Sequence, residues 1–387
     1  LFNIIYWIFG FLRMGTSGMT SQAYGKRDLP EIVRLLMRSV GIGLAVALCL
    51  ILLQVPIRQT AFLIIHPTAE VREMATLYFH ICIWGAPAML GLYGLSGWFI
   101  GMQNSRIPMY IAITQNIVNI IASLSFVCFF KMKVEGVAFG TLIAQYAGFI
   151  MGLVLWMSRY GKLKKYILWK GVLQKEAMMR FFQVNRDIFL RTLCLVTVTL
   201  FFTSAGASQG EIILAVNTLL MQLFTLFSYV MDGFAYAGEA LSGRYIGARN
   251  RKAFTNTTRH LFIWGGWLAA FFTLVYALGG NAFLGLLTDN KDVVSAAGTY
   301  FYWALAIPVA GIAAFIWDGI FIGATATRGM LASMAIAAIS FFVVYYGLRP
   351  VLGNHALWLA FLVYLAMRGV VQTLLSPKII KENFTQP

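Results

Sequence analysis

The stretch Gly97-Trp98-Phe99-Ile100-Gly101 returns later in the chain as Gly319-Ile320-Phe321-Ile322-Gly323, at an offset of 222 residues (319 − 97 = 222). The same offset pairs Arg106 with Arg328 without a gap. Small residues four positions apart allow two helix backbones to approach closely in lipid. The chain therefore carries an internal duplication, a pattern typical of membrane transporters built from two related bundles.

The composition places these bundles in a bilayer. Hydrophobic residues make up 60% of the 387 residues and charged residues only 11%, with a mean hydropathy of +0.76. This composition predicts an all-α integral membrane protein, because backbone groups in hydrocarbon must form their hydrogen bonds within the segment. A β-barrel would show alternating polarity along its strands, and the sequence shows none. We expect eleven spans, with approximate limits 1–24, 36–57, 74–102, 108–130, 134–157, 188–206, 211–243, 257–280, 294–324, 330–348 and 355–376.

The repeat indicates that one span lies upstream of the sequence. Residues 188–222 hold one whole span and the start of the next, and their counterparts at the same offset fall before residue 1. We therefore expect two repeated six-helix bundles related by a parallel pseudo-two-fold repeat, with the first of twelve transmembrane (TM) helices missing. The predicted division is an N-terminal lobe with TM2–TM6 at 1–158, a basic inter-lobe linker at 159–187, a C-terminal lobe with TM7–TM12 at 188–376, and a tail at 377–387.

The basic residues predict the orientation. With Tyr24-Gly25 in the cytoplasm, 22 of the 30 Lys and Arg residues fall on the cytoplasmic side and 6 on the other, Arg368 being counted with the C-terminal tail. The positive-inside rule then puts the linker and the C-terminus in the cytoplasm of a multi-pass protein of the bacterial inner membrane. The net charge of +16 is thus explained by topology, and we expect no nucleic-acid partner.

The linker has two interpretations. Lys162-Leu163-Lys164-Lys165-Tyr166 mixes cations with apolar and aromatic residues, as a segment lying on anionic lipid would. A solvated tether fits the same composition. The residues alone leave both interpretations open.

Ionisable residues inside spans mark the candidate site, because charge in the bilayer is expensive. A stripe with helical spacing runs along span 211–243 and comprises Thr225, Tyr229, Asp232, Tyr236 and Glu239. Span 294–324 carries Asp318, and span 188–206 carries Arg191. We predict Asp232, Asp318 and Glu239 as ion-coupling residues, with Arg191 as a charge partner.

Depth estimates suggest how these charges pair. At about 1.5 Å of rise per residue, Arg191 and Glu239 lie at similar depth, roughly 7 Å inside the nearest loop arginine. We therefore favour a pair between Arg191 and Glu239, although Arg191 can also reach Asp318. That pairing leaves Asp232 and Asp318 to take up a proton or a cation.

The first half offers fewer candidates. Arg13 lies in the opening span without an acidic partner in its half, and we expect that partner on the missing helix. Asn116 and Asn119 share one helix face and are substrate-cavity candidates, although we favour interhelical hydrogen bonds for them. The cysteines and histidines are scattered, so we expect neither a metal site nor a cofactor.

Three strings carry a family resemblance. They are Phe9-Gly10-Phe11-Leu12-Arg13-Met14-Gly15-Thr16-Ser17-Gly18, Asn185-Arg186-Asp187-Ile188-Phe189-Leu190-Arg191-Thr192-Leu193, and Met231-Asp232-Gly233-Phe234-Ala235-Tyr236-Ala237-Gly238-Glu239-Ala240. With them the chain resembles, over its whole length, the multidrug and toxic compound extrusion transporters, within the DNA-damage-inducible protein F branch. The resemblance implies two six-helix lobes around a central cavity and export of small organic, often cationic, compounds in exchange for protons or sodium.

The resemblance transfers only in part. Asp318 matches the acidic residue that members carry on TM10, but Arg191 is the only charged residue within the membrane on TM7, where sodium-type members have a glutamate. Proton coupling is therefore expected over sodium. Tyr229, Tyr236 and Thr225 are candidates for the substrate cavity of a protein expected to act as a monomer. A flippase for lipids or lipid-linked oligosaccharides is the alternative and would have a more cationic cavity; no shared constellation indicates an enzyme.

Overall fold

The computed structural model describes residues 2–385, and within that range the regular structure is helical throughout. The chain divides into two compact units, Leu1–Asn185 and Arg186–Pro387, with the boundary inside α9 (Lys175–Ala207). The division into lobes and linker predicted from the sequence can be placed on these helices. Helix α9 includes residues 175–187 of the predicted linker, and the last helix runs through much of the predicted tail, of which residues 386–387 lie outside the described range.

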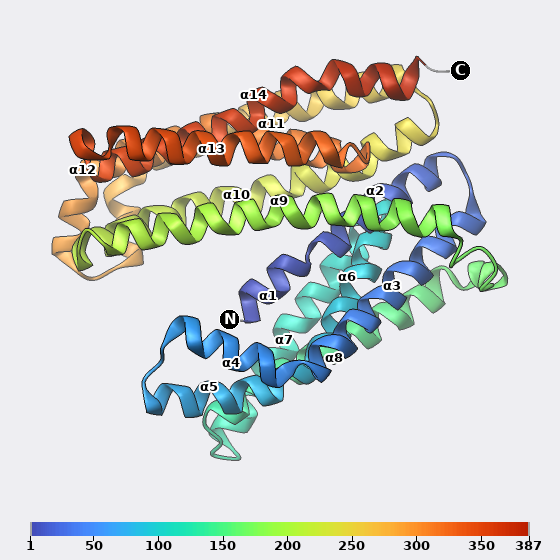
Figure 1. Cartoon of the computed structure of the whole chain (residues 1–387), viewed down its shortest axis with the longest axis horizontal. Coiled ribbons are helices and arrows are strands. Elements are labelled where there is room, and N and C mark those ends of the chain that lie inside the picture. The colour runs from blue at the N-terminus through green and yellow to red at the C-terminus, as the bar shows by residue number, and fades with distance from the viewer. Residues whose placement is uncertain (1, 386–387) are drawn as a thin grey trace. The chain divides into compact units, whose positions relative to one another are not determined.

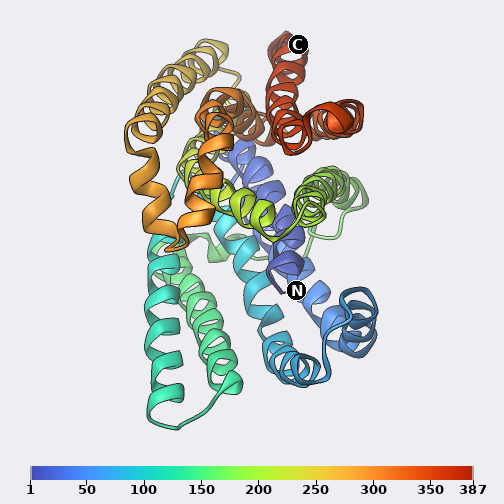
Figure 2. The same cartoon turned by 90° about the vertical axis from the view of Figure 1, so that its left-hand side faces the viewer.

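The first unit contains eight α-helices and two short 3₁₀ segments before α9 begins. They are α1 (Phe2–Phe9), α2 (Phe11–Gly25), α3 (Leu29–Leu52), α4 (Gln54–Ile65), α5 (Ala69–Cys82), η1 (Ile83–Gly85), α6 (Ala86–Gly101), α7 (Arg106–Cys128), α8 (Val134–Arg159) and η2 (Gly161–Tyr166). Helices α7 and α8 pack side by side as a hairpin (Figure 2).

The second unit contains most of α9 and five further long helices. They are α10 (Glu211–Gly247), α11 (Arg251–Leu287), α12 (Lys291–Gly323), α13 (Thr327–Leu352) and α14 (Asn354–Phe384). Helix α12 packs against α10, α11 and α14, and α14 packs against α13 (Figure 1). This arrangement brings α9, α12 and α14 around one buried point, described below.

Ten helical stretches of the described residues are long and apolar enough to cross a membrane, so the chain is an integral membrane protein. The expected first span, 1–24, is not one of them because it is divided at Gly10 into α1 and α2. Helix α2 also differs in character, since it buries a row of hydroxyl side chains, among them Thr16, Ser17 and Thr20. Ten of the eleven predicted spans are thus present as single helical stretches.

The helix ends confirm the duplication. Helix α11 covers the positions of α3 and α4 together, and α12 covers those of α5, η1 and α6, at the offset of 222 residues. Asp28 and Asn250 occupy equivalent N-cap positions and accept hydrogen bonds from backbone N–H groups in the first turn of the following helix. Both repeats therefore enter this helix through the same local geometry.

The two Gly-x-x-x-Gly stretches make the close contacts that their spacing predicts. A Cβ on Gly97 would overlap the carbonyl oxygen of Arg13 on α2, and one on Gly319 would overlap that of Ala235 on α10. Because Arg13 and Ala235 are themselves equivalent positions, both repeats use the same backbone-to-backbone contact. Only glycine allows this distance between the helices.

This contact predicts the effect of one added methyl group. Gly319→Ala should lower the free energy of unfolding by about 1–3 kcal/mol, because the methyl group overlaps the backbone of α10. Thermal unfolding in detergent measures the effect. Gly266→Ala on α11 is the matched control, since a Cβ there has no atom within 4 Å. Equal midpoints for the two variants would contradict the packing described here.

Candidate functional site

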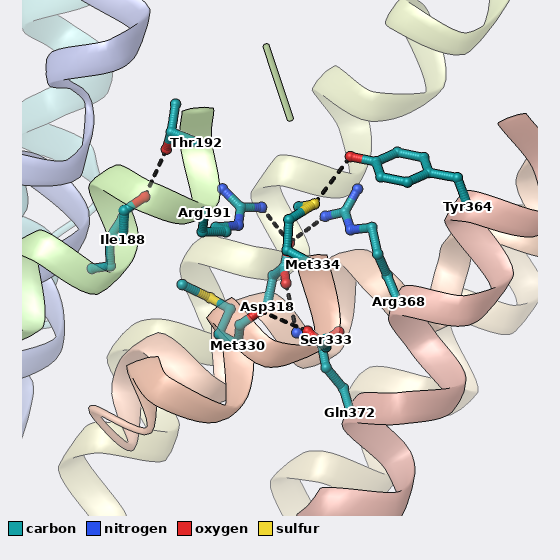
Figure 3. A network of polar contacts seen from close by, with 10 residues as sticks. All are labelled: Ile188, Arg191, Thr192, Asp318, Met330, Ser333, Met334, Tyr364, Arg368 and Gln372. Carbon is teal, nitrogen blue, oxygen red and sulfur yellow. Dashed lines mark hydrogen bonds and ion pairs between the residues drawn. The ribbon is translucent and has the colours of Figure 1, made fainter. Parts of the chain in front are cut away.

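Asp318 on α12 is the centre of a buried charged cluster in the second unit (Figure 3). Arg191 on α9 donates from Nη2 to Asp318 Oδ2 at 2.5 Å, and Arg368 on α14 donates from Nη2 to the same oxygen. Gln372, one turn further along α14, donates from Nε2 to Oδ1 at 2.7 Å. Both carboxylate oxygens are therefore engaged by side chains from two other helices.

The local sequence explains why these groups meet. Asp318 directly precedes Gly319, so the close contact of α12 with α10 also fixes the rotation of α12 and the direction of Asp318. On α14, Tyr364, Arg368 and Gln372 are spaced four apart and share one face. The Arg368 guanidinium lies 5.6 Å from the Tyr364 ring centroid, and the Tyr364 hydroxyl donates to Met334 Sδ on α13 at 3.1 Å. The Tyr364 ring, itself held by this hydrogen bond, thus packs against Arg368.

The cluster holds two cations and one anion. Arg191, Arg368 and Asp318 are all buried, with exposed fractions of 6%, 4% and 6%. A buried carboxylate between two guanidinium groups is strongly held as an anion, whereas the removal of that anion would leave two cations in a low-dielectric interior. Asp318 therefore ties together three helices, α9, α12 and α14, through charge.

Two expectations from the sequence are corrected here. Arg191 pairs with Asp318 and not with Glu239, because helix rotation places it toward α12. Arg368, counted with the cytoplasmic tail, is buried within α14 and forms the second ion pair. Asp318, which the favoured pairing left without a basic partner, therefore has two. The four-residue spacing of Tyr364, Arg368 and Gln372 is the signal that could have identified this face.

The predicted stripe on α10 divides between buried and exposed positions. Glu239 is buried, Asp232 is partly buried, and Tyr236 and Tyr229 are exposed by 36% and 71%. Asp232, Tyr236 and Glu239 each have an interaction partner in the chain. The Thr225 hydroxyl donates to the Met221 carbonyl of its own helix at 3.0 Å. These residues share α10 but are not members of the Asp318 cluster.

The first-unit candidates lie on two helices, Asn116 and Asn119 on α7 and Arg13 on α2. Asn116 donates to the Ala112 carbonyl at 2.9 Å, and Asn119 Oδ1 accepts a hydrogen bond from the Ser123 hydroxyl at 3.0 Å. Both amides thus form hydrogen bonds within α7. The interhelical hydrogen bonds that we favoured from the sequence are therefore wrong for these two residues. Arg13 lies on α2, a different helix, and has an interaction partner of its own.

The described residues contain no group of three or more His, Cys, Asp or Glu side chains that could hold a metal ion. The four cysteines are free thiols; Cys82 is buried, Cys194 partly buried, and Cys49 and Cys128 exposed.

Comparison with known proteins places the chain among membrane transporters. The MatE family model matches residues 1–124 and 188–348. The Escherichia coli DNA damage-inducible protein F is 37% identical over 372 residues, which cover 95% of this chain and 80% of that protein. The Arabidopsis thaliana protein DETOXIFICATION 42 is 24% identical, with 89% of this chain covered and 66% of the plant protein.

Solved structures share the fold. A crystal structure of MATE in the bent conformation matches with a TM-score of 0.88 at 18% identity, over 99% of this chain and 86% of that chain. The bent form of the Vibrio cholerae MATE transporter VcmN matches with a TM-score of 0.80 at 17% identity, over 98% and 86% of the two chains.

The charge balance of the cluster predicts a ranking of variants. Asp318→Asn should lower the free energy of unfolding by about 3–5 kcal/mol because it leaves two buried arginines without a counter-charge. Arg368→Gln should lower it less, because Asp318 keeps Arg191. Thermal midpoints in detergent measure both, with Asp292→Asn, an exposed acid on α12, as the control. The reverse order would contradict this account of the cluster.

Proposed function

Because the chain belongs to the MatE family of multidrug and toxic compound extrusion transporters, we propose that it exports small organic compounds in exchange for protons, as a monomer in a bacterial inner membrane. It is a transporter and not an enzyme. The observation that carries the proposal is the family match to both repeats, together with the 37% identity to the Escherichia coli protein. The coupling ion and the substrate class are inferred from the site.

Protons are favoured over sodium by the surroundings of Asp318. A hard cation needs free oxygen ligands, and both oxygens of Asp318 already accept N–H groups. A proton instead adds to the carboxylate and removes its charge.

The charge change suggests how coupling works. In the arrangement described here the two guanidinium groups disfavour protonation of Asp318. In an arrangement that separates them from Asp318, protonation would remove the anion that holds Arg191 and Arg368 to α12, and the tie between α9, α12 and α14 would be weakened. Two packing arrangements of these helices would then differ in proton affinity, which is the requirement for an alternating-access cycle. In this scheme Asp232 and Glu239 on α10 are further proton-accepting groups, and Arg191 and Arg13 are charge partners.

The substrate class follows from the aromatic groups on α10. Tyr229 and Tyr236 are exposed, and the face of a tyrosine ring attracts organic cations. Thr225 adds a neutral polar group on α10, and Asn116 and Asn119 stay substrate-cavity candidates of the first unit. We infer amphipathic organic cations as the preferred substrates.

Proteoliposomes test the coupling ion. A pH gradient should drive uptake or efflux of a fluorescent organic cation such as ethidium, whereas a sodium gradient alone should not. Asp232→Asn should reduce gradient-driven transport at least about tenfold, because the amide cannot carry the proton. Glu211→Gln, at the exposed start of α10, is the matched control. Transport driven by sodium alone would refute proton coupling.

The orientation is a separate proposal with its own test. The excess of basic residues on one side supports a cytoplasmic position for the segment between α8 and α9. In a variant with the four native cysteines replaced by serine, a cysteine introduced by Lys170→Cys should resist an impermeant thiol reagent in intact cells and react after lysis. Labelling before lysis would reverse the topology.

A further inference from the structure

The segment from residue 160 to 174, between α8 and α9, lies at a membrane face because both flanking helices are long and apolar enough to span the bilayer. It contains no acidic residue and four lysines: Lys162, Lys164, Lys165 and Lys170. In Figure 1 it is the green stretch of chain that links the end of α8 to the start of α9. We refer to residues 160–174 as the connecting segment.

Arg38 on α3 holds the connecting segment on the first unit. Its Nε donates to the Val172 carbonyl at 2.7 Å, its Nη2 to the Gly171 carbonyl at 2.8 Å, and its Nη1 to Glu31 Oε1 at 2.8 Å. Arg38 is only 3% exposed and Val172 only 2%. Gly171 adopts a φ of +85°, which glycine accepts without strain. The segment is therefore docked on α3 and is not a free tether.

In the docked connecting segment, three large apolar side chains remain exposed. Leu168, Trp169 and Leu173 are exposed by 62%, 75% and 71%. Three apolar side chains of this size turned toward water would leave a large apolar surface uncovered. Tryptophan beside aliphatic residues at a membrane face is instead typical of the interfacial zone, where the ring meets both the headgroups and the acyl chains.

The lysines add charge of one sign to the same surface. All four are exposed, and none of them forms an ion pair with any described residue. Lys162 and Lys165 are three apart within the 3₁₀ segment η2 and so lie on one edge. Lys165 lies over the Tyr166 ring, with Nζ 5.1 Å from the centroid. Cations of this kind attract the anionic surface of a phospholipid leaflet.

We propose that the connecting segment, held in place by Arg38, is a binding surface for the headgroups of anionic phospholipids. The lysines meet the phosphate groups, while Leu168, Trp169 and Leu173 insert at the level of the acyl-chain boundary. A free phosphate ion would find no enclosed site here, because the lysines are exposed and spread along the segment. The combination of fixed backbone, unpaired cations and exposed apolar side chains therefore points to lipid.

Thermal unfolding of the full chain in detergent tests the proposal. Added phosphatidylglycerol should raise the midpoint, whereas phosphatidylcholine and glycerol phosphate should not, and 0.5 M salt should reduce the effect by screening. Replacement of the four lysines by glutamine should weaken the apparent affinity for phosphatidylglycerol at least about tenfold. Lys131→Gln, Lys133→Gln and Lys291→Gln, made together at other exposed lysines, form the control.

The outcomes separate the possible ligands. Equal effects of phosphatidylglycerol and phosphatidylcholine would overturn the anionic-lipid surface, as would an unchanged response of the four-lysine variant. An equal effect of glycerol phosphate would identify a soluble phosphate site instead and overturn the lipid proposal.

A second measurement locates the lipid on the segment itself. In nanodiscs, phosphatidylglycerol with brominated acyl chains should quench Trp169, so native protein should lose more fluorescence than the Trp169→Phe variant. Arg38→Gln should diminish this difference, because the released segment no longer presents Trp169 at a fixed depth. Equal quenching of native protein and Trp169→Phe would overturn the proposal without depending on the stability of the other variants.

Discussion

The backbone contact between α12 and α10 is the constraint on which the second unit depends. Gly319 and Gly323 leave no room for a side chain against α10, so both the distance and the rotation of α12 are fixed. Asp318 is the residue before Gly319, and its direction is set by the same contact. The first unit repeats the packing with Gly97 and Gly101 but places Ser96 at the position of Asp318. The same scaffold thus serves both repeats, and at this position the second repeat carries a charged side chain where the first carries a serine.

Two opposing effects act on this charged centre, the cost of burying each ion and the attraction between the ions. Burial disfavours every ion in it, yet each ion is needed by the others, because Asp318 compensates Arg191 and Arg368 and they compensate Asp318. The contacts described here suit an ionised Asp318 between two charged arginines. In the proposed transport cycle, a change in the protonation of Asp318 would therefore act directly on the packing of α9, α12 and α14.

The repeat, the helical class and the family resemblance could all be predicted from the sequence, since they depend on spacing and hydropathy along one dimension. The pairing of Arg191 could not, because a rise per residue gives the depth of a side chain but not its rotation about the helix axis. Arg368 was missed for a related reason: its nearness to the C-terminus and to Lys378 suggested a basic tail, whereas α14 continues to Phe384. The break at Gly10 was hidden as well, because hydropathy does not distinguish one helix from two. The coupling roles of Asp232, Glu239 and Asp318 stay predictions.

The left-handed turns at the helix ends have a consequence for how the two repeats diverged. Arg27 and Arg249 are equivalent, with φ values of 57° and 53°, and Gln103 and Thr325 form a second such pair. For a residue with a side chain, the left-handed conformation is about 1–2 kcal/mol less favourable than the right-handed conformation. Glycine, which has no Cβ, does not carry this cost. Lys131 and Gly353 are a third equivalent pair, in which the second repeat has glycine where the first has lysine. The first pair keeps arginine in both repeats, so the same left-handed turn accepts a long side chain at both of its positions in the duplicated scaffold.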